Sequence, residues 1–372
     1  MKFTVSKDAL LSCLQVTKQV ISSKNVLPVL ENFLFEVSEG TLTVTASDNE
    51  TTLSQRIELM DCDTDGCIAI NAKMITDAMK EVPEQPVAFF INQDTWEINV
   101  KYQNGDFSMM GVEPVDFPAA AILAEDAHIF KAPAGELLAG IKNVLFAVAN
   151  DELRPVMNGI YFEVEGNKMT LVASDGTLLV RRRTVLDAES ARGSFILPKK
   201  PASVLSGVLA KHTDGIVIQS DTRNICFTVG DTIMTCRMIE GRYPNYNSVI
   251  PQDNSCYLTV SRQALISALK RVSVFANSAT NLVKIQASMG GVVLSCMDID
   301  FSTSSKEQIE CEYNGINMTI GFKSTLLLGI LNNLSTSEIR MELKDATRAA
   351  LLKPVDSDLD ITMLLMPMQI NV

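Results

Sequence analysis

Three aspartates close alternating apolar segments of this sequence, and a carboxylate at such a corner could serve as an acid, a base or a metal ligand. Asp48, Asp175 and Asp298 end the stretches LTVTASD, MTLVASD and VVLSCMD. Asp175 is followed by Gly176, a pair that is typical of tight turns. One shared carboxylate site would require the three side chains to meet, so their positions in the fold decide between a site and three turns.

Other residue types that support catalysis or metal binding are sparse. The two histidines, His128 and His212, lie in no metal-ligand or catalytic-triad spacing, and no phosphate-binding glycine motif is present. The eight cysteines are scattered, and the closest pair, Cys62 and Cys67, lacks the CxxC spacing of a zinc or redox site. We therefore expect free thiols, no metal, no cofactor and no enzymatic activity.

An internal repeat determines the expected architecture. The segments that begin at Phe3, Phe130 and Leu258 align without gaps at offsets of 127 and 128 residues, and each reads as a short strand followed by an amphipathic helix. Ser6 and Ser261 stand where helix N-caps are expected. The three aspartates fall at matching places, one per copy, so we interpret them as turn residues rather than as one site.

Each copy continues with a second strand and helix, starting at Ile70, Leu197 and Gly321, and then with further strands. The sequence therefore predicts an α+β fold with three tandem copies of one domain, each with two helices packed on antiparallel sheets. We place the domains at residues 1–122, 128–250 and 255–372.

Composition sets the broad class of protein. Nearly half of the 372 residues are apolar and a fifth are charged, as expected for a fully folded chain. The N-terminus lacks the apolar core of a signal peptide, and no run approaches the roughly 18 apolar residues of a membrane span. We expect a cytoplasmic protein that does not enter a membrane.

Charge is distributed unevenly along the chain. The net charge of −12 would by itself argue against nucleic-acid binding. The six expected helices, however, carry twelve basic side chains against only four acidic ones: Lys7, Lys18, Lys73, Lys80, Lys142, Lys199, Lys200, Lys211, Arg262, Lys270, Arg271 and Lys323. Helices that face one way would form a positive surface, although lysine is also a common residue on solvated helix faces.

An ordered set of motifs resembles the bacterial sliding clamp family, the beta subunit of the replicative DNA polymerase. The set comprises MKFTV at the start, LPVLEN from Leu27, LRPVMNGIYFE from Leu153, ASDGTLL from Ala173, EGRYPNYNSVIP from Glu240 and LMPM from Leu365. Each motif is short, but together they cover the whole chain in order. The resemblance implies a processivity factor without catalysis, a clamp loader as a partner, and clients that include the replicative polymerase.

The resemblance also implies a head-to-tail homodimer that forms a ring of six domains around duplex DNA. A domain of this length has a diameter of roughly 35 Å, so six touching domains leave a hole of about 35 Å and four leave about 15 Å. Duplex DNA, roughly 20 Å across, fits only the larger ring. Such a ring would contact phosphates without reading bases, through cations of the expected helices: Lys73, Lys80, Lys142, Lys199, Lys200 and Arg271. The resemblance adds Lys24, which aligns with a DNA-contacting loop of the family, and Arg154, where the middle domain would meet the duplex.

Two further sites follow from the resemblance. A site for short client peptide motifs would be lined by Met157, Ser174, Gly176, Thr177, Leu178, Leu179, Pro244, Val249, Leu364, Met366 and Met368. The chain departs from the family there, with Thr177 and Leu178 in place of His-Arg and Val156 in place of an aromatic residue. The dimer seam would use Met74, Phe107 and Met109 against Val274, Phe275 and Asp300, with Lys73 facing Asp298 or Asp300. We expect the apolar side chains of this seam to be exposed in an isolated chain.

Two alternatives stand beside the clamp. A clamp-like paralogue could carry the same motifs with another task, and an acidic three-repeat scaffold could bind proteins without encircling DNA. The scaffold predicts no basic lining, so the excess of lysine and arginine on the helices favours the clamp.

Overall fold

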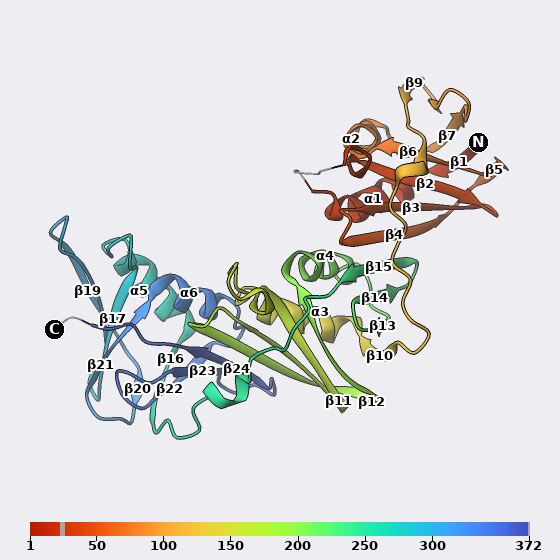
Figure 1. The fold of residues 1–372 in the computed structure, drawn as a ribbon. Coiled ribbons are helices and arrows are strands. Elements are labelled where there is room, and N and C mark those ends of the chain that lie inside the picture. Colours follow the sequence, from red (N-terminus) through yellow and green to blue (C-terminus); the bar gives the residue numbers. More distant parts are fainter. Residues whose placement is uncertain (23–26, 371–372) are drawn as a thin grey trace. The chain divides into compact units, whose positions relative to one another are not determined.

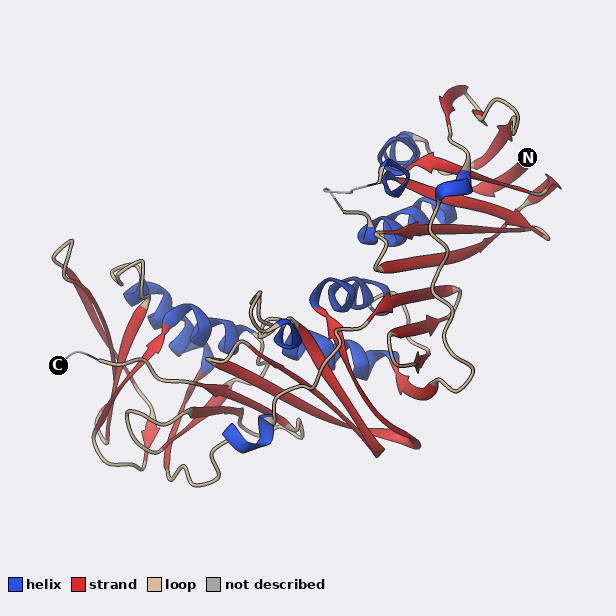
Figure 2. Cartoon of the chain, viewed as in Figure 1, coloured by secondary structure: helices blue, strands red, loops and turns tan. Residues whose placement is uncertain are grey.

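The computed structural model describes residues 1–22 and 27–370, without the side chains of 187–191. Contacts between Cα atoms divide the chain into two compact units. Unit 1 comprises residues 1–138, 190–192 and 200–238, and unit 2 comprises 139–189, 193–199 and 239–372. The secondary structure alternates helices and antiparallel strands throughout the described residues (Figures 1 and 2).

Unit 1 contains two antiparallel sheets, whose strands are named here in their spatial order. The five-stranded sheet is formed by β5 (Asp61–Thr64), β1 (Lys2–Ser6), β7 (Pro86–Ile91), β8 (Glu97–Tyr102) and β9 (Gly105–Met110). The eight-stranded sheet is formed by β10 (His128–Pro133), β13 (Gly215–Ser220), β14 (Asn224–Val229), β15 (Thr232–Arg237), β4 (Thr51–Glu58), β3 (Thr41–Ser47), β2 (Asn32–Ser38) and β6 (Gly66–Asn71).

Unit 2 contains the other two sheets. The seven-stranded sheet is formed by β11 (Gly159–Ser174), β12 (Leu178–Pro198), β24 (Ile361–Leu365), β23 (Ala350–Pro354), β22 (Glu338–Leu343), β16 (Cys256–Ser261) and β20 (Glu312–Tyr313). The four-stranded sheet is formed by β19 (Thr303–Ile309), β18 (Gly291–Asp298), β17 (Leu282–Ser288) and β21 (Met318–Lys323).

In the described residues, six α-helices stand where the repeats predict them: α1 (Lys7–Thr17), α2 (Ala72–Glu81), α3 (Ala134–Leu145), α4 (Lys199–Leu209), α5 (Arg262–Ser273) and α6 (Ser324–Asn332). Ser6 caps α1 and Ser261 caps α5, because each hydroxyl accepts a hydrogen bond from a first-turn amide at 3.5 and 3.4 Å. Both predicted caps are confirmed, and Asn71 caps α2 in the same way.

The helices pack between sheets and complete the cores. In unit 1, α1 contacts β1 of the five-stranded sheet and β3 and β4 of the eight-stranded sheet, and it also contacts α2. Phe3, Phe35 and Phe89 are fully buried there, with the rings of Phe3 and Phe89 stacked at 4.8 Å. In unit 2, α5 contacts strands of both sheets and packs against α6. The helices thus bury one face and leave the other to carry charge.

Candidate functional site

The three repeated aspartates are bonded within their own turns. In each turn, Oδ1 accepts hydrogen bonds from the backbone amides two and three residues ahead. The distances are 3.1 and 2.7 Å at Asp48, 2.7 and 2.7 Å at Asp175, and 3.0 and 3.2 Å at Asp298. These are Asx turns that join consecutive strands of a hairpin, which confirms the interpretation as turn residues.

The middle turn, between β11 and β12, resembles the first turn, in which Asn49 also has a positive φ and its amide donates to the buried Ser47 Oγ. Gly176 adopts φ +92°, a left-handed conformation that favours glycine. Ser174 Oγ is buried, donates to the carbonyl of Leu178 at 2.8 Å and accepts from the Gly176 amide at 3.1 Å. The hydroxyl and the glycine together fix this corner of unit 2.

Arg154 lies against this turn. Its Nε donates to Asp151 Oδ2 at 2.8 Å, and its Nη2 donates to the Asp175 carbonyl at 3.4 Å. The hydrogen bond from Arg154 lowers the pKa of Asp151 below its usual value, with help from the Leu153 amide. The guanidinium is therefore held beside Gly176 by its own loop.

Part of the set predicted to bind client peptides lies at the pairing of β12 with β24, while the Met368 amide donates to the Gly321 carbonyl. Leu179 lies opposite Leu364, and the Met366 amide donates to the Thr177 carbonyl at 2.8 Å. Five of the set are buried, namely Met157, Ser174, Leu178, Leu179 and Leu364. Gly176, Thr177, Pro244, Val249 and Met366 are exposed and Met368 is half-buried. The set therefore combines an exposed rim with an apolar floor.

Tyrosines form much of that floor, and the sequence reasoning missed them. Tyr243 and Tyr246 are buried in one cluster with Leu179 and Leu364, and the ring of Tyr161 stacks on Tyr243 at 4.9 Å. The Tyr246 hydroxyl donates to Glu163 Oε2 at 2.6 Å, and burial together with this bond raises the pKa of Tyr246 to about 12. Both tyrosines of this cluster lie in the stretch EGRYPNYNSVIP, from which the sequence analysis took only Pro244 and Val249.

The predicted DNA-contacting cations differ in how they are bonded. Lys24 lies outside the described residues. Lys80 pairs with Asp77 at 3.0 Å, Lys200 with Asp48 at 2.5 Å, and Arg271 with Glu307 at 2.5 Å. Lys199 Nζ donates to the Val148 carbonyl at 3.3 Å. Within the described parts of the chain, the exposed Lys73 and Lys142 make no side-chain hydrogen bond or ion pair.

The predicted seam residues are mostly solvent-exposed in the single chain. Met74 is 56%, Val274 77% and Phe275 41% exposed, and Phe107 is half-buried. Met109 is buried at 8% exposure, so the expectation that this side chain is exposed in an isolated chain was wrong. Asp300 accepts a hydrogen bond from Asn277 at 3.4 Å.

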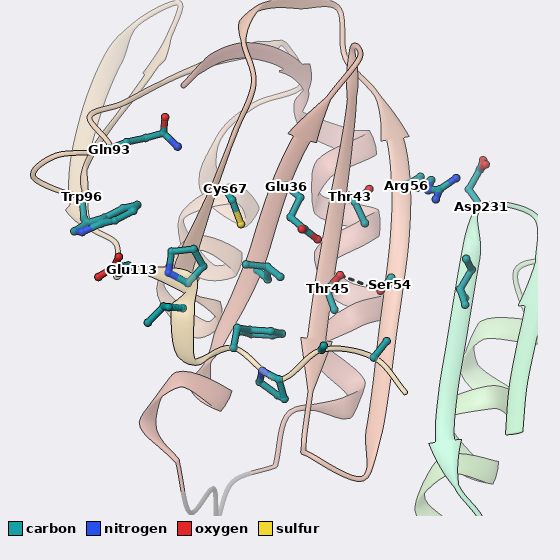
Figure 3. Close-up of a pocket in the computed structure, with 18 residues that line it drawn as sticks. Glu36, Thr43, Thr45, Ser54, Arg56, Cys67, Gln93, Trp96, Glu113 and Asp231 are labelled. Carbon is teal, nitrogen blue, oxygen red and sulfur yellow. Dashed lines mark hydrogen bonds between the residues drawn. The ribbon is translucent and has the colours of Figure 1, made fainter. Parts of the chain in front are cut away.

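A cleft of about 780 Å³ lies on the surface of unit 1. Figure 3 shows Glu36, Thr43 and Arg56 on its sheet wall, Trp96 at its opposite side, and Asp231 beside Arg56. A smaller cleft of about 460 Å³ lies in unit 2 and is lined by Glu163, Thr170, Arg183 and Asp360. These residues are the equivalents, one repeat later, of Glu36, Thr43, Arg56 and Asp231 in the first cleft. Because two copies of the repeat form the same kind of cleft, we attribute it to the way in which repeats join, not to one active site.

Among the described residues, no cluster of three or more His, Cys, Asp or Glu side chains has an arrangement suitable for a metal ion. All eight cysteines are free thiols, and Cys62, Cys67 and Cys311 are only partly buried. Burial raises the pKa of the Cys67 thiol to about 11. None of the described helices has both the length and the apolar character needed to span a bilayer.

Comparison with known proteins gives the same result along the entire chain. Residues 1–121, 132–245 and 247–369 match the family models of the N-terminal, central and C-terminal domains of the DNA polymerase III beta subunit. The chain is 29% identical over 373 residues to a beta sliding clamp of Pseudomonas aeruginosa and 26% identical over 370 residues to that of Escherichia coli, with all of each chain covered.

Solved structures agree with the sequence matches. A crystal structure of a sliding clamp from Pseudomonas aeruginosa bound to griselimycin superposes with a TM-score of 0.94 at 28% identity, over the full length of both chains. A DNA polymerase III beta subunit from Thermotoga maritima superposes with a TM-score of 0.92 at 25% identity, again over both full chains.

Proposed function

The chain belongs to the family of the DNA polymerase III beta subunit and is a sliding clamp, and from this premise we propose how its residues perform that function. The observation that carries the proposal is the order of the matches: all three clamp domains follow one another over almost the whole sequence. This order supports a clamp and not an acidic scaffold that never binds DNA. We place the domain boundaries at residues 1–122, 128–250 and 255–372.

Two chains join head to tail in a ring of six domains. The first domain meets the third domain of the other chain at a seam formed by Met74, Phe107 and Met109 on one side and Val274, Phe275 and Asp300 on the other. Large apolar side chains at high exposure, such as Val274 and Phe275, support a partner on this surface. A dimer with two identical seams closes without leaving a free end.

The hole of the ring holds duplex DNA through dispersed cations. In the described residues of the single chain, Lys73 and Lys142 have no ion pair to break, although Lys73 is also expected to face Asp298 or Asp300 at the seam. Lys80, Lys200 and Arg271 must exchange a carboxylate for a phosphate. Contacts with phosphates bind DNA without regard to sequence and weaken as salt rises. The acidic remainder of the chain keeps DNA away from other surfaces.

Client proteins bind at the corner where β12 pairs with β24. The exposed Met366, Val249 and Pro244 form a flexible apolar rim over a floor of Leu179 and Leu364, and thioether side chains adapt to different apolar anchors. Because Arg154 lies against the Gly176 turn, we assign it to the client site as well as to the DNA-contacting set. There it takes the role of the arginine that other clamps place after the glycine.

The clamp promotes synthesis by tethering, without a chemical step of its own. A polymerase bound to a ring on the template meets the primer end at a high effective concentration, so a weak peptide contact is enough to make synthesis processive. A closed ring cannot be threaded onto DNA that has no end, so a clamp loader must open one seam.

Primer extension on a closed circular template tests the function. Wild-type protein, added with a polymerase and loader from a related bacterium, should lengthen the products, and Phe275→Asp should abolish this effect while giving monomers in light scattering. Val185→Asp, at an exposed apolar residue on β12, is the matched control and should behave as wild type. A Phe275→Asp protein that stays dimeric would overturn the seam, and unchanged product length with the wild-type dimer would overturn the function.

A further inference from the structure

The clefts of unit 1 and unit 2 lie at equivalent places in two repeats, but they are filled differently. In unit 2, Tyr161 and Tyr246 pack with Val172 in one apolar cluster over the sheet, with the two tyrosine rings 6.1 Å apart. The cleft that remains there measures about 460 Å³, against about 780 Å³ in unit 1. The first repeat therefore leaves open a space that the second repeat fills with its own side chains.

The linker after β9, residues 111–127, accounts for part of this difference. The first and second repeats end in the sequences DFP and RYP, and two residues beyond the proline stand Ala120 and Tyr246. Ala120 lines the cleft of unit 1 and is exposed, whereas Tyr246 is buried. An alanine thus stands where the second repeat places a phenol ring over the sheet.

One row of the sheet also contributes. In the first repeat, β2 pairs with β6 and β6 is bridged to the linker, which gives a row of three modest side chains: Leu34, Ala69 and Val112. The equivalent row of the second repeat has a larger residue at each place: Tyr161, Ile196 and Ile239. Val112 is 44% exposed, as expected for an apolar residue that lacks a cover.

The second repeat shows what a carboxylate at this place can bind. Glu163 accepts hydrogen bonds from the hydroxyl of Tyr246 at 2.6 Å and from that of Tyr161 at 3.4 Å. Glu36 is its equivalent, and within the described residues the Glu36 carboxylate accepts no hydrogen bond and forms no ion pair. The open cleft therefore presents an acceptor that is occupied by phenol hydroxyls one repeat later.

The cleft of unit 1 is acidic. Its lining contains three carboxylates and one guanidinium, those of Glu36, Glu113, Asp231 and Arg56. None of these four side chains has an ion pair in the described part of the chain, whereas Arg183 and Asp360 of the second cleft lie 3.8 Å apart. This lining attracts cations and repels phosphates, so the occupant is not a nucleic acid.

Trp96 and Glu113 stand together at one side of the cleft (Figure 3). The Gly111 amide donates to the Trp96 carbonyl at 2.9 Å, and Trp96 has a φ of +60°, a left-handed conformation that is uncommon for a bulky residue. The face of a tryptophan attracts the side chain of lysine or arginine, and a carboxylate beside it adds an ion pair. This side of the cleft therefore suits a basic residue.

The spacing of the polar groups suits neighbouring side chains of a peptide. Since β6 lies between β2 and the linker, Glu36 and Glu113 lie about two strand spacings, or roughly 10 Å, apart. The linker also offers main-chain contacts, because the amides of Ala119 and Ala120 donate no hydrogen bond within the described residues. A volume of about 780 Å³ lies in the usual range of roughly 300–1,000 Å³ for ligand sites.

We propose that this cleft binds a short segment of a partner protein in which a tyrosine stands beside a lysine or arginine. The tyrosine ring covers Leu34 in the space next to Ala120, and its hydroxyl donates to Glu36. The basic side chain lies on Trp96 and pairs with Glu113. The site lies in unit 1, apart from the client surface of unit 2, and it does not depend on closure of the ring.

Trp96 is the single tryptophan of the chain, so its fluorescence reports on this cleft. Titration of the wild-type protein with acetyl-Lys-Tyr-amide should give a saturable change. Acetyl-Lys-Phe-amide lacks the hydroxyl and acetyl-Glu-Tyr-amide reverses the charge, so each should bind at least about tenfold more weakly. Absence of a saturable change with the first peptide, or equal affinities for all three, would overturn the proposal.

Two variants test the assignment of residues. Ala120→Tyr supplies the ring of the second repeat and should abolish the fluorescence change. Glu36→Ala removes the acceptor and should erase the preference for the tyrosine peptide over the phenylalanine peptide. Glu58→Ala is the matched control and should bind as wild type, since Glu58 is exposed at the end of β4 and outside the cleft. Undiminished binding by Ala120→Tyr, or an unchanged preference in Glu36→Ala, would contradict the site.

A small cationic phenol is the other possible occupant. Tyramine carries the phenol and a positive charge but has no peptide carbonyl for the amides of Ala119 and Ala120, so it should bind several-fold more weakly than acetyl-Lys-Tyr-amide. Equal affinity would assign the cleft to a small molecule and overturn the peptide.

Discussion

Gly176 shows how one residue can belong to both the fold and the site. Its φ of +92° requires a left-handed backbone, and a Cβ there would lie 3.2 Å from Arg154 Nη1. The same turn carries Asp175, whose carboxylate bonds two backbone amides. Because Gly176 has no side chain, the guanidinium of Arg154 has room to lie beside the proposed client surface.

Gly176→Ala should lower the free energy of unfolding by about 1–2 kcal/mol, because alanine is strained at this φ. Gly135→Ala is the control, since Gly135 lies in α3 with open space around its Cβ position and alanine favours helices by about 0.5–1 kcal/mol. Urea denaturation checks both changes. Equal effects at the two positions would contradict the role of the backbone angle.

Met366→Glu should weaken the binding of a client peptide with a Leu or Phe anchor at least tenfold, because the peptide would bury an unpaired charge. Calorimetry measures the affinity, and the dimer should persist in light scattering. Met289→Glu, at a methionine that is 85% exposed in the β17–β18 turn, should leave peptide binding unchanged. Undiminished binding by Met366→Glu would place the client site elsewhere.

The sequence grouped residues of one expected surface but not their hydrogen-bond partners. Leu179 and Leu364, which the family motifs assign to that surface, lie opposite each other across β12 and β24. The position of Arg154 was not predictable, because it depends on a hydrogen bond to Asp151 and on a carbonyl 21 residues away in the sequence. Long-range contacts of this kind leave no periodic signal.

At the scale of elements, the helices are amphipathic units whose outer faces carry the cations. Lys142 on α3 and Lys73 on α2 are exposed and lack an ion pair in the described residues, whereas Arg271 on α5 is held by Glu307. The hydrogen bond to Arg271 lowers the pKa of Glu307 below its usual value. Unpaired cations reach phosphates without losing an existing contact, so they should contribute most to DNA binding.

Reversal of Lys73 and Lys142 to Glu should weaken DNA association and flatten the plot of log affinity against log salt by about one unit per lost phosphate contact. Fluorescence anisotropy over a salt series gives the slope. Lys168→Glu with Lys101→Glu, exposed lysines on or beside sheet strands, provides a control of equal charge. If both double variants change the slope equally, net charge and not the helical surface controls binding.

Helices and strands were more predictable than the joints between repeats. The 3.6-residue and two-residue periods fix which segments are helix and strand, and the repeat fixes their order. The pairing of β4 with β15 joins segments about 180 residues apart, and only the structure reveals which edges meet. β9 and β19, which hold the corresponding places in the first and third repeats, stand at edges of their sheets.

At the scale of the whole molecule, a chain with a net charge of −12 binds a polyanion by separating its charges between helices and other segments. A closed ring adds a topological constraint that no single contact supplies. Its affinity for DNA therefore depends on the ends of the DNA as well as on salt. This dependence distinguishes a sliding clamp from a protein that merely adheres to the duplex.

Retention on DNA of different topology is the most direct measurement of that claim. Labelled protein is loaded onto a nicked circular plasmid, passed over a gel-filtration column, and measured again after one restriction cut. The account predicts that the protein stays with the circle in high salt and leaves once the DNA is linear. Equal retention on circular and linear DNA, or loss from both, would contradict a ring that encircles the duplex.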